Sequence, residues 1–159
     1  MVRKNGIDMK GKKVVILGNG GASQAVQAGV KHLGASEQII VGHRTMKDGV
    51  ITYEECFDRH ADADIIVNTS PVGMFPAIDA SPVDLTKFPQ CHAVVDIIAN
   101  PLTTKLVAQA RDLGMTGITG LEMLVAQAKY ASEIFQGIKI PEERIDEIYQ
   151  KLANSTAPI

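Results

Sequence analysis

The amino-acid sequence predicts an α/β protein built on a parallel β-sheet with helices on both faces. Short, almost continuously apolar runs alternate along the chain with segments of helical periodicity. Such runs are typical of strands buried on both sides, as in a doubly wound parallel sheet. The chain length fits a single domain, residues 1–159, with a core at about 11–153 and a frayed tail at 154–159.

Five apolar runs are predicted as strands because they contain β-branched residues and end near turn-forming residues. The first run, VVIL, stops at Gly18, and the fourth, AVVDII, is followed by Asn100-Pro101. The predicted strands are residues 14–17, 38–41, 64–68, 93–98 and 116–118. Between the third and fourth strands, residues 77–90 are predicted as a loop with about one turn of helix.

Five segments are predicted as helices, most of them because apolar residues recur every three to four positions. Gly34 and Gly114 provide C-terminal stops, and Thr103 is the expected N-cap of the third helix. Pro141 is expected at the first position of the last helix, where its fixed φ is already helical. The predicted helices are residues 22–33, 53–60, 103–113, 120–135 and 141–153.

Composition excludes several classes of function. The net charge is −2 with 21% charged residues, so no broad positive field would attract nucleic acid or an anionic membrane. No apolar run reaches the roughly 18 residues of a membrane span, and no apolar run of a signal peptide follows the basic first residues. Cys56 and Cys91 lack metal-ligand spacing and are expected to be reduced thiols. These features predict a cytoplasmic protein without a bound metal.

The segment GNGGAS, at Gly18–Ser23, joins the first predicted strand to the first helix and predicts a Rossmann-type dinucleotide site. Gly18 permits a tight turn, Gly20 lets the backbone approach a pyrophosphate, and the helix N-terminus supplies free N–H groups. The third small position is Ala22 or Ser23. A plain tight turn is the alternative, and a methyltransferase site is weaker because no acidic residue precedes Gly18. The predicted cofactor-binding residues are Gly18, Asn19, Gly20, Gly21 and Ala22.

The end of the second predicted strand indicates which dinucleotide binds. An NAD site places Asp or Glu about 20 residues past the turn, whereas this chain has VGHRTMK there. Arg44 is a fork-shaped donor suited to a phosphate monoester, and Lys47 adds a second positive charge. These residues predict NADP(H), with His43 at the adenosine end. Asp48 weakens the basic character, and a solvated Arg44 is the alternative.

Five segments together resemble the motifs of shikimate dehydrogenase, in the same order and at similar spacing. They are ILGNGGAS, GHRT, NTSPVGM, DIIANPLTT and GLEMLVAQA, and the resemblance extends from about Ile7 to Gly137. It implies NADPH-dependent reduction of 3-dehydroshikimate to shikimate, in aromatic amino acid biosynthesis. It also implies an enzyme of two domains, of which this chain resembles only the second, cofactor-binding one.

The catalytic residues of that family lie in the other domain. Members carry a lysine in an S-x-x-N-V-T-x-P-x-K motif and an aspartate in an N-T-D motif, both before the glycine turn. Here 17 residues precede Gly18, and none of them matches either motif. The nicotinamide supplies the hydride, but ketone reduction also needs a positioned acid. We therefore predict no catalytic residue in this chain and no turnover by the chain alone.

The resemblance implies further contacts on the cofactor side. The loop after the third predicted strand would pass the ribose and nicotinamide, and the start of the long helix would lie beside the nicotinamide ring. For the helix start, ordinary packing is the alternative. The residues predicted in this way are Thr45, Asn68, Thr69, Ser70, Met74, Ile97, Gly120 and Met123.

The substrate side matches the family less well. Gln127 corresponds to a glutamine that binds the substrate hydroxyls, with a solvated side chain as the alternative. Ala99 stands where the family usually has tyrosine, and Ser132 where it usually has phenylalanine. These differences fit relaxed demands on the substrate side, a divergent paralogue or a different substrate.

Three hypotheses for function remain from the sequence. The chain is the cofactor domain of a shikimate dehydrogenase-type enzyme with a substrate domain or complementary chain as partner, a non-catalytic NADP(H)-binding module, or a related enzyme. The related enzymes are quinate dehydrogenase and the glutamyl-tRNA or methylene-tetrahydrofolate reductase types. The missing half also predicts an exposed apolar patch and a homodimer or other partner. The patch is expected at Val72, Met74, Phe75, Ile98 and Met123.

Overall fold

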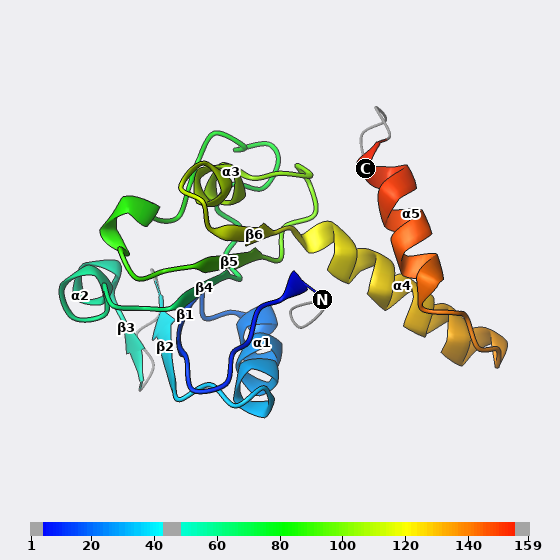
Figure 1. Cartoon of the computed structure of the whole chain (residues 1–159), viewed down its shortest axis with the longest axis horizontal. Helices are drawn as coiled ribbons and strands as arrows, with labels where there is room; N and C mark the ends of the chain where they lie inside the picture. The colour runs from blue at the N-terminus through cyan, green and yellow to red at the C-terminus, as the bar shows by residue number, and fades with distance from the viewer. Residues whose placement is uncertain (1–4, 43–48, 155–159) are drawn as a thin grey trace.

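A computed structural model describes residues 5–42 and 49–154 and contains a six-stranded, all-parallel sheet (Figure 1). The strand order is β3-β2-β1-β4-β5-β6. The strands are β1 (Lys13–Leu17), β2 (Glu37–Val41), β3 (Val50–Ile51), β4 (Ile65–Asn68), β5 (Ala93–Asp96) and β6 (Thr116–Ile118). The predicted Rossmann-type parallel fold is confirmed. The sequence pattern does not predict β3, because two residues are too few to show a periodicity.

Helices cover both faces of the sheet (Figure 1). One face packs against α1, and the other packs against α2, α3 and a single turn of 3₁₀ helix, η2. A long helix, α4, leaves the sheet edge and is followed by α5. The helices are α1 (Gly21–His32), α2 (Tyr53–Arg59), η2 (Leu85–Lys87), α3 (Lys105–Asp112), α4 (Gly120–Gln136) and α5 (Glu143–Ala153).

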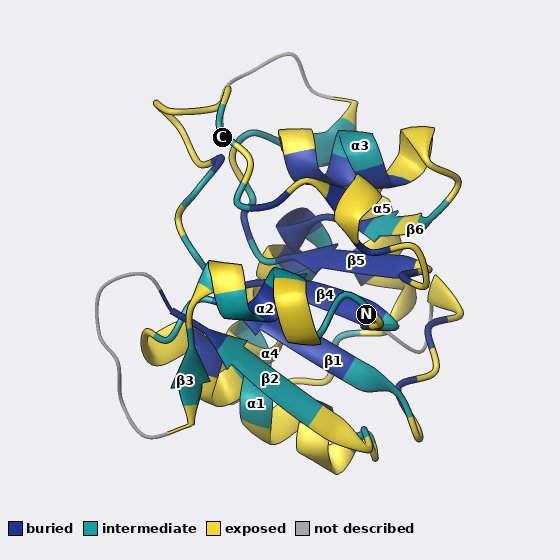
Figure 2. Cartoon of the chain, turned by 90° about the vertical axis from the view of Figure 1, so that its left-hand side faces the viewer, coloured by how far each residue is buried: buried dark blue, intermediate teal, exposed yellow. Residues whose placement is uncertain are grey.

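The core is divided by the sheet into two layers, and the central strands are the most deeply buried part of the chain (Figure 2). In β1, Val15 and Leu17 point into the layer under α2 and α3, whereas Val14 and Ile16 point into the layer under α1. All four side chains are fully buried. A strand buried on both faces has to be apolar at every position, which explains the continuous runs in the sequence.

Two helix starts differ from the sequence prediction. The N-cap of α3 is Thr104, not Thr103, and its hydroxyl accepts a hydrogen bond from the Val107 N–H at 3.4 Å. The last helix begins at Glu143, so Pro141 is not its first residue. Instead, the Pro141 carbonyl accepts the Arg144 N–H at 3.1 Å, which closes a turn before the helix. Either threonine could cap a helix. Thr104 is the cap, and its hydroxyl also donates a hydrogen bond to the buried carboxylate of Asp96.

The last two helices form a hairpin that projects from the α/β body (Figure 1). α4 meets the sheet at its first turn, where Gly120 packs on the backbone that follows β5. Gly137 ends α4 in the left-handed conformation, with φ of 65°. α5 then packs back on α4 through a small apolar cluster of its own, centred on Leu121, Val125 and Ile145.

Candidate functional site at the carboxyl edge of the sheet

The strand order places a topological switch point between β1 and β4. From β1 the chain runs outward to β2 and β3, then returns to pair β4 on the other side of β1. The connections that leave the carboxyl ends of β1 and β4 therefore run in opposite directions and open a crevice between them. Ligands of doubly wound sheets bind at this place. The segments at this edge are the glycine turn after β1 and the loops that follow β4, β5 and β6.

The glycine turn is fixed against the loop after β4. Gly18 has φ of 106°, a conformation that L side chains rarely adopt, and a Cβ there would lie 2.8 Å from Thr69 Oγ1. The Thr69 hydroxyl donates a hydrogen bond to the Leu17 carbonyl at 2.8 Å, and the Gly18 N–H donates to the Val41 carbonyl at 2.8 Å. The carboxyl ends of β1, β2 and β4 are thus connected to one another around Gly18.

The start of α1 has the properties of an anion site. Gly20 is the N-cap, and no side chain caps the helix. The first turn also contains no acidic residue. A Cβ added at Gly20 or Gly21 would meet nothing within 4 Å. The free N–H groups and the positive end of the helix dipole therefore face open space, which is the arrangement that binds a phosphate.

The small residue that packs at this helix start is Ser23, which is fully buried, whereas Ala22 is exposed. The side chain of Gln27 donates to the Ser23 hydroxyl at 3.0 Å. Of the two alternatives for the third small position, the structure thus selects Ser23. The role of Ala22 as a cofactor-binding residue remains a prediction.

The end of β2 approaches the glycine turn from the other side. A Cβ at Gly42 would lie 3.1 Å from Asn19 Nδ2, so the Asn19 side chain lies directly against the β2 end. The residues predicted to bind the adenosine and its phosphate follow Gly42, but His43, Arg44, Thr45 and Lys47 lie outside the described residues. Their role in selecting NADP(H) remains a prediction.

A buried carboxylate joins the loops after β4 and β5. Asp96 is fully buried, and its Oδ1 accepts hydrogen bonds from Asn68 Nδ2 and from the Ile98 N–H, both at 3.1 Å. Its Oδ2 accepts from the Thr104 hydroxyl at 2.7 Å. Burial raises the pKa of Asp96, and these hydrogen bonds oppose the shift. The sequence prediction did not single out Asp96 or Thr104, although an aspartate inside an apolar strand was a visible signal.

The side-chain amide of Asn68 forms hydrogen bonds with other residues of the protein. Its Nδ2 donates to Asp96, and its Oδ1 accepts from both the N–H and the hydroxyl of Ser70, at 3.0 and 2.7 Å. Asn68 is fully buried, while Thr69 and Ser70 are partly exposed at the crevice. The amide therefore shapes the loop that carries Thr69 and Ser70, and any contact of these three residues with a cofactor remains a prediction.

The first turn of α4 completes the edge. A Cβ at Gly120 would lie 2.1 Å from the Ile97 carbonyl oxygen, so only glycine fits. Met123 and Ile97 line the same apolar hollow, together with residues of α1. Gln127, one helical turn beyond Met123, is exposed. The structure thus brings Ile97, Gly120 and Met123 together and leaves Gln127 accessible beyond them.

The predicted apolar patch is present in part. Met74 and Phe75 are 46% and 64% exposed, and Val72 and Met123 are partly exposed. The inclusion of Ile98 was wrong, because its side chain is 5% exposed. Backbone contacts hold this residue in place: its N–H binds Asp96, and its carbonyl accepts the Gly120 N–H at 3.0 Å.

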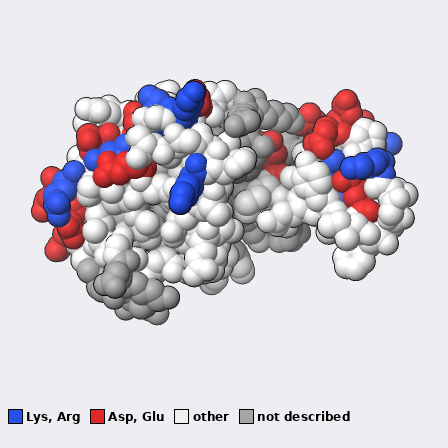
Figure 3. Space-filling model, turned by 90° about the horizontal axis from the view of Figure 1, so that it is seen from below, with Lys and Arg blue, Asp and Glu red and all other residues white. Residues whose placement is uncertain are grey.

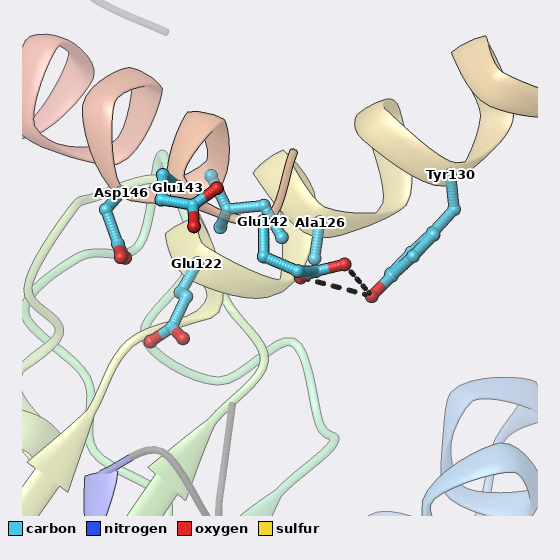
Figure 4. Close-up of a pocket in the computed structure, with 7 residues that line it drawn as sticks. Glu122, Ala126, Tyr130, Glu142, Glu143 and Asp146 are labelled. Atoms are coloured by element: carbon cyan, nitrogen blue, oxygen red, sulfur yellow. Dashed lines mark hydrogen bonds between the residues drawn. The ribbon is translucent and has the colours of Figure 1, made fainter. Parts of the chain in front are cut away.

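A hollow between the last two helices is poorly suited to a nucleotide. This hollow of about 340 Å³ lies between α4 and α5, and Glu122, Glu142, Glu143 and Asp146 line it (Figure 4). Four carboxyl groups would repel a phosphate. On the face shown in Figure 3, charged side chains gather toward the two ends, with a largely uncharged surface between them.

Cys56 and Cys91 are free, buried thiols, and burial raises the pKa of each to about 11. Among the described residues, no three His, Cys, Asp or Glu side chains are grouped as metal ligands. Within the same residues, no helix combines the length and apolarity needed to cross a bilayer.

Comparison with known proteins gives a consistent result. No family model matches the chain. The shikimate dehydrogenase (NADP(+)) of Crocosphaera subtropica is 37% identical over 142 residues, which are 77% of this chain and 49% of that protein. Shikimate dehydrogenase from Clostridium beijerinckii is 32% identical over 162 residues, which are 97% of this chain and 59% of that protein.

Solved structures agree with these relatives. Shikimate dehydrogenase 1 from Peptoclostridium difficile superimposes with a TM-score of 0.86 at 36% identity, over 96% of this chain and 57% of that one. The Thermus thermophilus shikimate 5-dehydrogenase in complex with NADP(H) and shikimate has a TM-score of 0.76 at 26% identity, over 94% and 58%. Quinate dehydrogenase from Corynebacterium glutamicum with NAD also has a TM-score of 0.76 at 26% identity, over 91% and 56%. The chain thus spans roughly half to three fifths of these proteins.

Proposed function

We propose that this chain, which is homologous to part of the shikimate dehydrogenases, is the NADP(H)-binding domain of an oxidoreductase of that type. The observation that carries the proposal is the start of α1, with uncapped N–H groups, no acidic residue in the first turn and open space beyond Gly20 and Gly21. This cradle lies at the switch point, where a pyrophosphate would be held by backbone N–H groups. The homologue that holds NADP(H) and shikimate supports the same assignment.

The residues of this chain would bind and orient the cofactor. The turn from Gly18 to Gly21 would hold the pyrophosphate, and Arg44 and Lys47 would select the additional phosphate of NADP. The loop of Thr69 and Ser70 would lie along the ribose. A bound nicotinamide would supply the hydride, and the protein would fix its position relative to the substrate.

We further propose that the chain is catalytically incomplete by itself. The carboxylate that the described loops bring to this edge, Asp96, is fully buried and accepts three hydrogen bonds, so it is not placed to transfer a proton to substrate. The proton donor would come from a substrate domain or a complementary chain. The relatives are longer than the part that this chain matches, and a substrate domain could lie in their additional residues.

Quinate dehydrogenase chemistry is the second candidate, because one superimposed structure is a quinate dehydrogenase. The two candidates share the cradle and differ in the hydroxy acid that is oxidised. A non-catalytic module that only holds NADP(H) is the remaining alternative.

The first test is calorimetric titration of the purified chain with NADP⁺ and, separately, with NAD⁺. We expect tighter binding of NADP⁺ and a loss of that preference in Arg44→Ala. Lys151→Ala removes one cation from an exposed position on α5 and is the matched control, with binding unchanged. Absence of binding by either dinucleotide would contradict the proposed function.

A second test separates a catalytic domain from a binding module. The chain is mixed with a separately expressed part of a relative that this chain does not match, and reduction of 3-dehydroshikimate or oxidation of shikimate or quinate is followed at the nicotinamide absorbance. Turnover only in the mixture supports the enzyme assignment and identifies the substrate. Cofactor binding with no turnover in any mixture supports the binding module.

A further inference from the structure

Asp96, the last residue of β5, is a fully buried carboxylate that accepts three hydrogen bonds. Burial raises its pKa and these hydrogen bonds oppose the shift, and no positively charged group of the described residues is among the causes. A carboxylate that is buried without a cation lowers the stability of a fold. Residues that break a packing rule in this way are typical of positions that serve function.

The first hydrogen bond of Asp96 orients the loop after β4. Asn68 and Asp96 are paired at the ends of neighbouring strands, and Asn68 Nδ2 donates to Asp96 Oδ1 at 3.1 Å. Three donors point at Asp96, which suits an ionised carboxylate because it can only accept. The Asn68 amide therefore turns its N–H groups toward Asp96 and its oxygen toward Ser70. That oxygen accepts the N–H and the hydroxyl of Ser70 at 3.0 and 2.7 Å, so the position of Ser70 depends on Asp96.

The second hydrogen bond reaches the start of α4. The Ile98 N–H donates to Asp96 Oδ1 at 3.1 Å, and the Ile98 carbonyl accepts the Gly120 N–H at 3.0 Å. Gly120 also packs so closely on the Ile97 carbonyl that a Cβ would lie 2.1 Å from its oxygen. Met123, in the same turn of α4, lines an apolar hollow together with Ile97. Asp96 thus fixes the segment on which the first turn of α4 rests.

The third hydrogen bond supports the loop after β4 from its other side. The hydroxyl of Thr104, a buried residue, donates to Asp96 Oδ2 at 2.7 Å. Gly73 of the loop lies against this side chain, since a Cβ at Gly73 would be 3.8 Å from Thr104 Cβ. The loop after β4 therefore packs on a side chain that Asp96 holds in place.

The glycine turn is held by a different set of contacts. The Gly18 N–H donates to the Val41 carbonyl, and the N–H and hydroxyl of Thr69 both donate to the Leu17 carbonyl, each at 2.8 Å. None of these three hydrogen bonds involves Asp96. Loss of the Asp96 carboxylate should therefore disturb one side of the crevice and leave the glycine turn in place.

We propose that Asp96 is a positioning residue for the nicotinamide half of the cofactor, because it orients the Ser70 loop and the first turn of α4 as one unit. The inference rests on the proposed function, with the Ser70 loop along the ribose and, as the family resemblance implies, the start of α4 beside the nicotinamide ring. The adenosine half and the pyrophosphate depend on the glycine turn instead. Asp96 is buried and touches neither cofactor nor substrate, so it acts through Asn68, Ile98 and Thr104.

Calorimetric titration of the full chain with two probes tests this inference. NADP⁺ contains both halves, and the second probe is the adenosine bisphosphate that forms the adenosine half of NADP⁺. Asp96→Ala should weaken NADP⁺ binding at least about tenfold and change the affinity for the bisphosphate by less than about twofold. Asp96→Asn keeps a side-chain oxygen for the Asn68 and Ile98 N–H groups, and it should bind NADP⁺ within about threefold of the wild type.

Asp84→Ala is the matched control. Asp84 Oδ1 also accepts three hydrogen bonds, from the N–H and hydroxyl of Thr86 and from Gln109 Nε2, but it is an exposed residue at the start of η2. Its replacement should leave both affinities unchanged. Thermal unfolding identifies a titration temperature at which every variant is folded. If Asp96→Ala does not fold, Asn68→Ala removes only the link to the loop and should show the same difference between the two probes.

The fluorescence of bound NADPH reports on the nicotinamide itself. At saturating protein, the wild-type chain should change the emission of the dihydronicotinamide relative to free NADPH. With Asp96→Ala, the emission of bound NADPH should be closer to that of the free cofactor. A loss of stability alone would not produce this difference, because only folded protein binds.

The outcomes distinguish this inference from the proposed function. The inference is overturned if the wild type binds NADP⁺ and Asp96→Ala binds it equally tightly, or if Asp96→Ala weakens both probes by the same factor. It is also overturned if Asp96→Asn is as impaired as Asp96→Ala, or if bound NADPH has the same emission in the wild type and Asp96→Ala. A wild-type chain that binds neither probe contradicts the proposed function, and the inference fails with it.

Discussion

Two glycines, two residues apart in the turn after β1, are expected to respond oppositely to the same substitution. At Gly18, alanine would adopt φ of 106° and place its Cβ 2.8 Å from Thr69 Oγ1 and 3.0 Å from the Ser70 nitrogen. At Gly20, φ is −83° and ψ is −169°, which suits alanine, and the added methyl group meets nothing within 4 Å. Gly18→Ala should therefore affect folding, and Gly20→Ala should affect the ligand.

The expected magnitudes follow from this geometry. A side chain in a sparsely populated backbone region costs about 1–3 kcal/mol, and moving the Thr69–Ser70 backbone adds about 1 kcal/mol. Gly18→Ala should thus lower the free energy of unfolding by about 2–4 kcal/mol and the Tm by roughly 5–15 °C for a chain of this size. Gly20→Ala should cost less than about 1 kcal/mol, but its methyl group should weaken NADP⁺ binding at least about tenfold.

Urea unfolding and calorimetric titration of the same preparations measure both quantities. Gly29→Ala is the control, because Gly29 lies in the C-terminal half of α1, away from the glycine turn, and a Cβ there also meets nothing within 4 Å. It should leave binding unchanged and raise stability by about 0.5–1 kcal/mol. A Gly18→Ala variant that unfolds at the wild-type urea concentration, or a Gly20→Ala variant that binds NADP⁺ as tightly as the wild type, would contradict the different roles assigned to these two glycines.

Three further predictions concern the buried groups. Because burial raises the pKa of Asp96, the folded protein holds this proton more tightly than the unfolded chain, and stability present below the unfolded pKa is lost as pH rises through the folded one. In urea titrations from about pH 4 to pH 7, Asp96→Asn should therefore gain stability relative to the wild type, whereas parallel pH profiles would contradict this. Gly120→Ala should lower the free energy of unfolding by more than about 4 kcal/mol or prevent folding, because its Cβ would overlap the Ile97 carbonyl; a soluble variant with wild-type Tm would disprove the close packing. Cys56 and Cys91, with pKa values raised to about 11, should react with a thiol reagent at pH 8 only after denaturation, and rapid labelling of the native protein would show that they are accessible.

The sheet could be predicted from the sequence because its strands are buried on both faces. In β1, each residue from Val14 to Leu17 has to be apolar, whichever side it points to. The glycine turn was predictable for a similar reason, since few residues other than glycine adopt φ of 106°. Burial of a strand on both faces and a left-handed backbone conformation each restrict the residue type at a given position. Such restrictions can be recognised in a single sequence.

Features that depend on distant contacts could not be predicted in the same way. Thr103 and Thr104 are equally suited to capping, and Thr104 is the cap because its hydroxyl also reaches Asp96, eight residues earlier in the chain. Ile98 resembles a surface loop residue in the sequence, and it is buried because α4 begins directly above it. Both outcomes depend on how the loop after β5 packs against the rest of the fold. Such packing leaves no periodic pattern of residues in the sequence.

The arrangement at the carboxyl edge also explains how cofactor binding and catalysis could be divided between polypeptides. Gly18 is fixed against Thr69, and the Thr69–Ser70 loop is held by Asn68 through Asp96, which is bound in turn to Thr104 at the start of α3. Every one of these contacts is made within the chain itself. The proposed cofactor cradle therefore needs no second domain to form, because the backbone N–H groups that we expect to bind the pyrophosphate are held in place by the chain itself. No contact described here positions a proton donor for the substrate. We therefore expect the isolated chain to bind NADP(H), and we expect turnover to require another polypeptide.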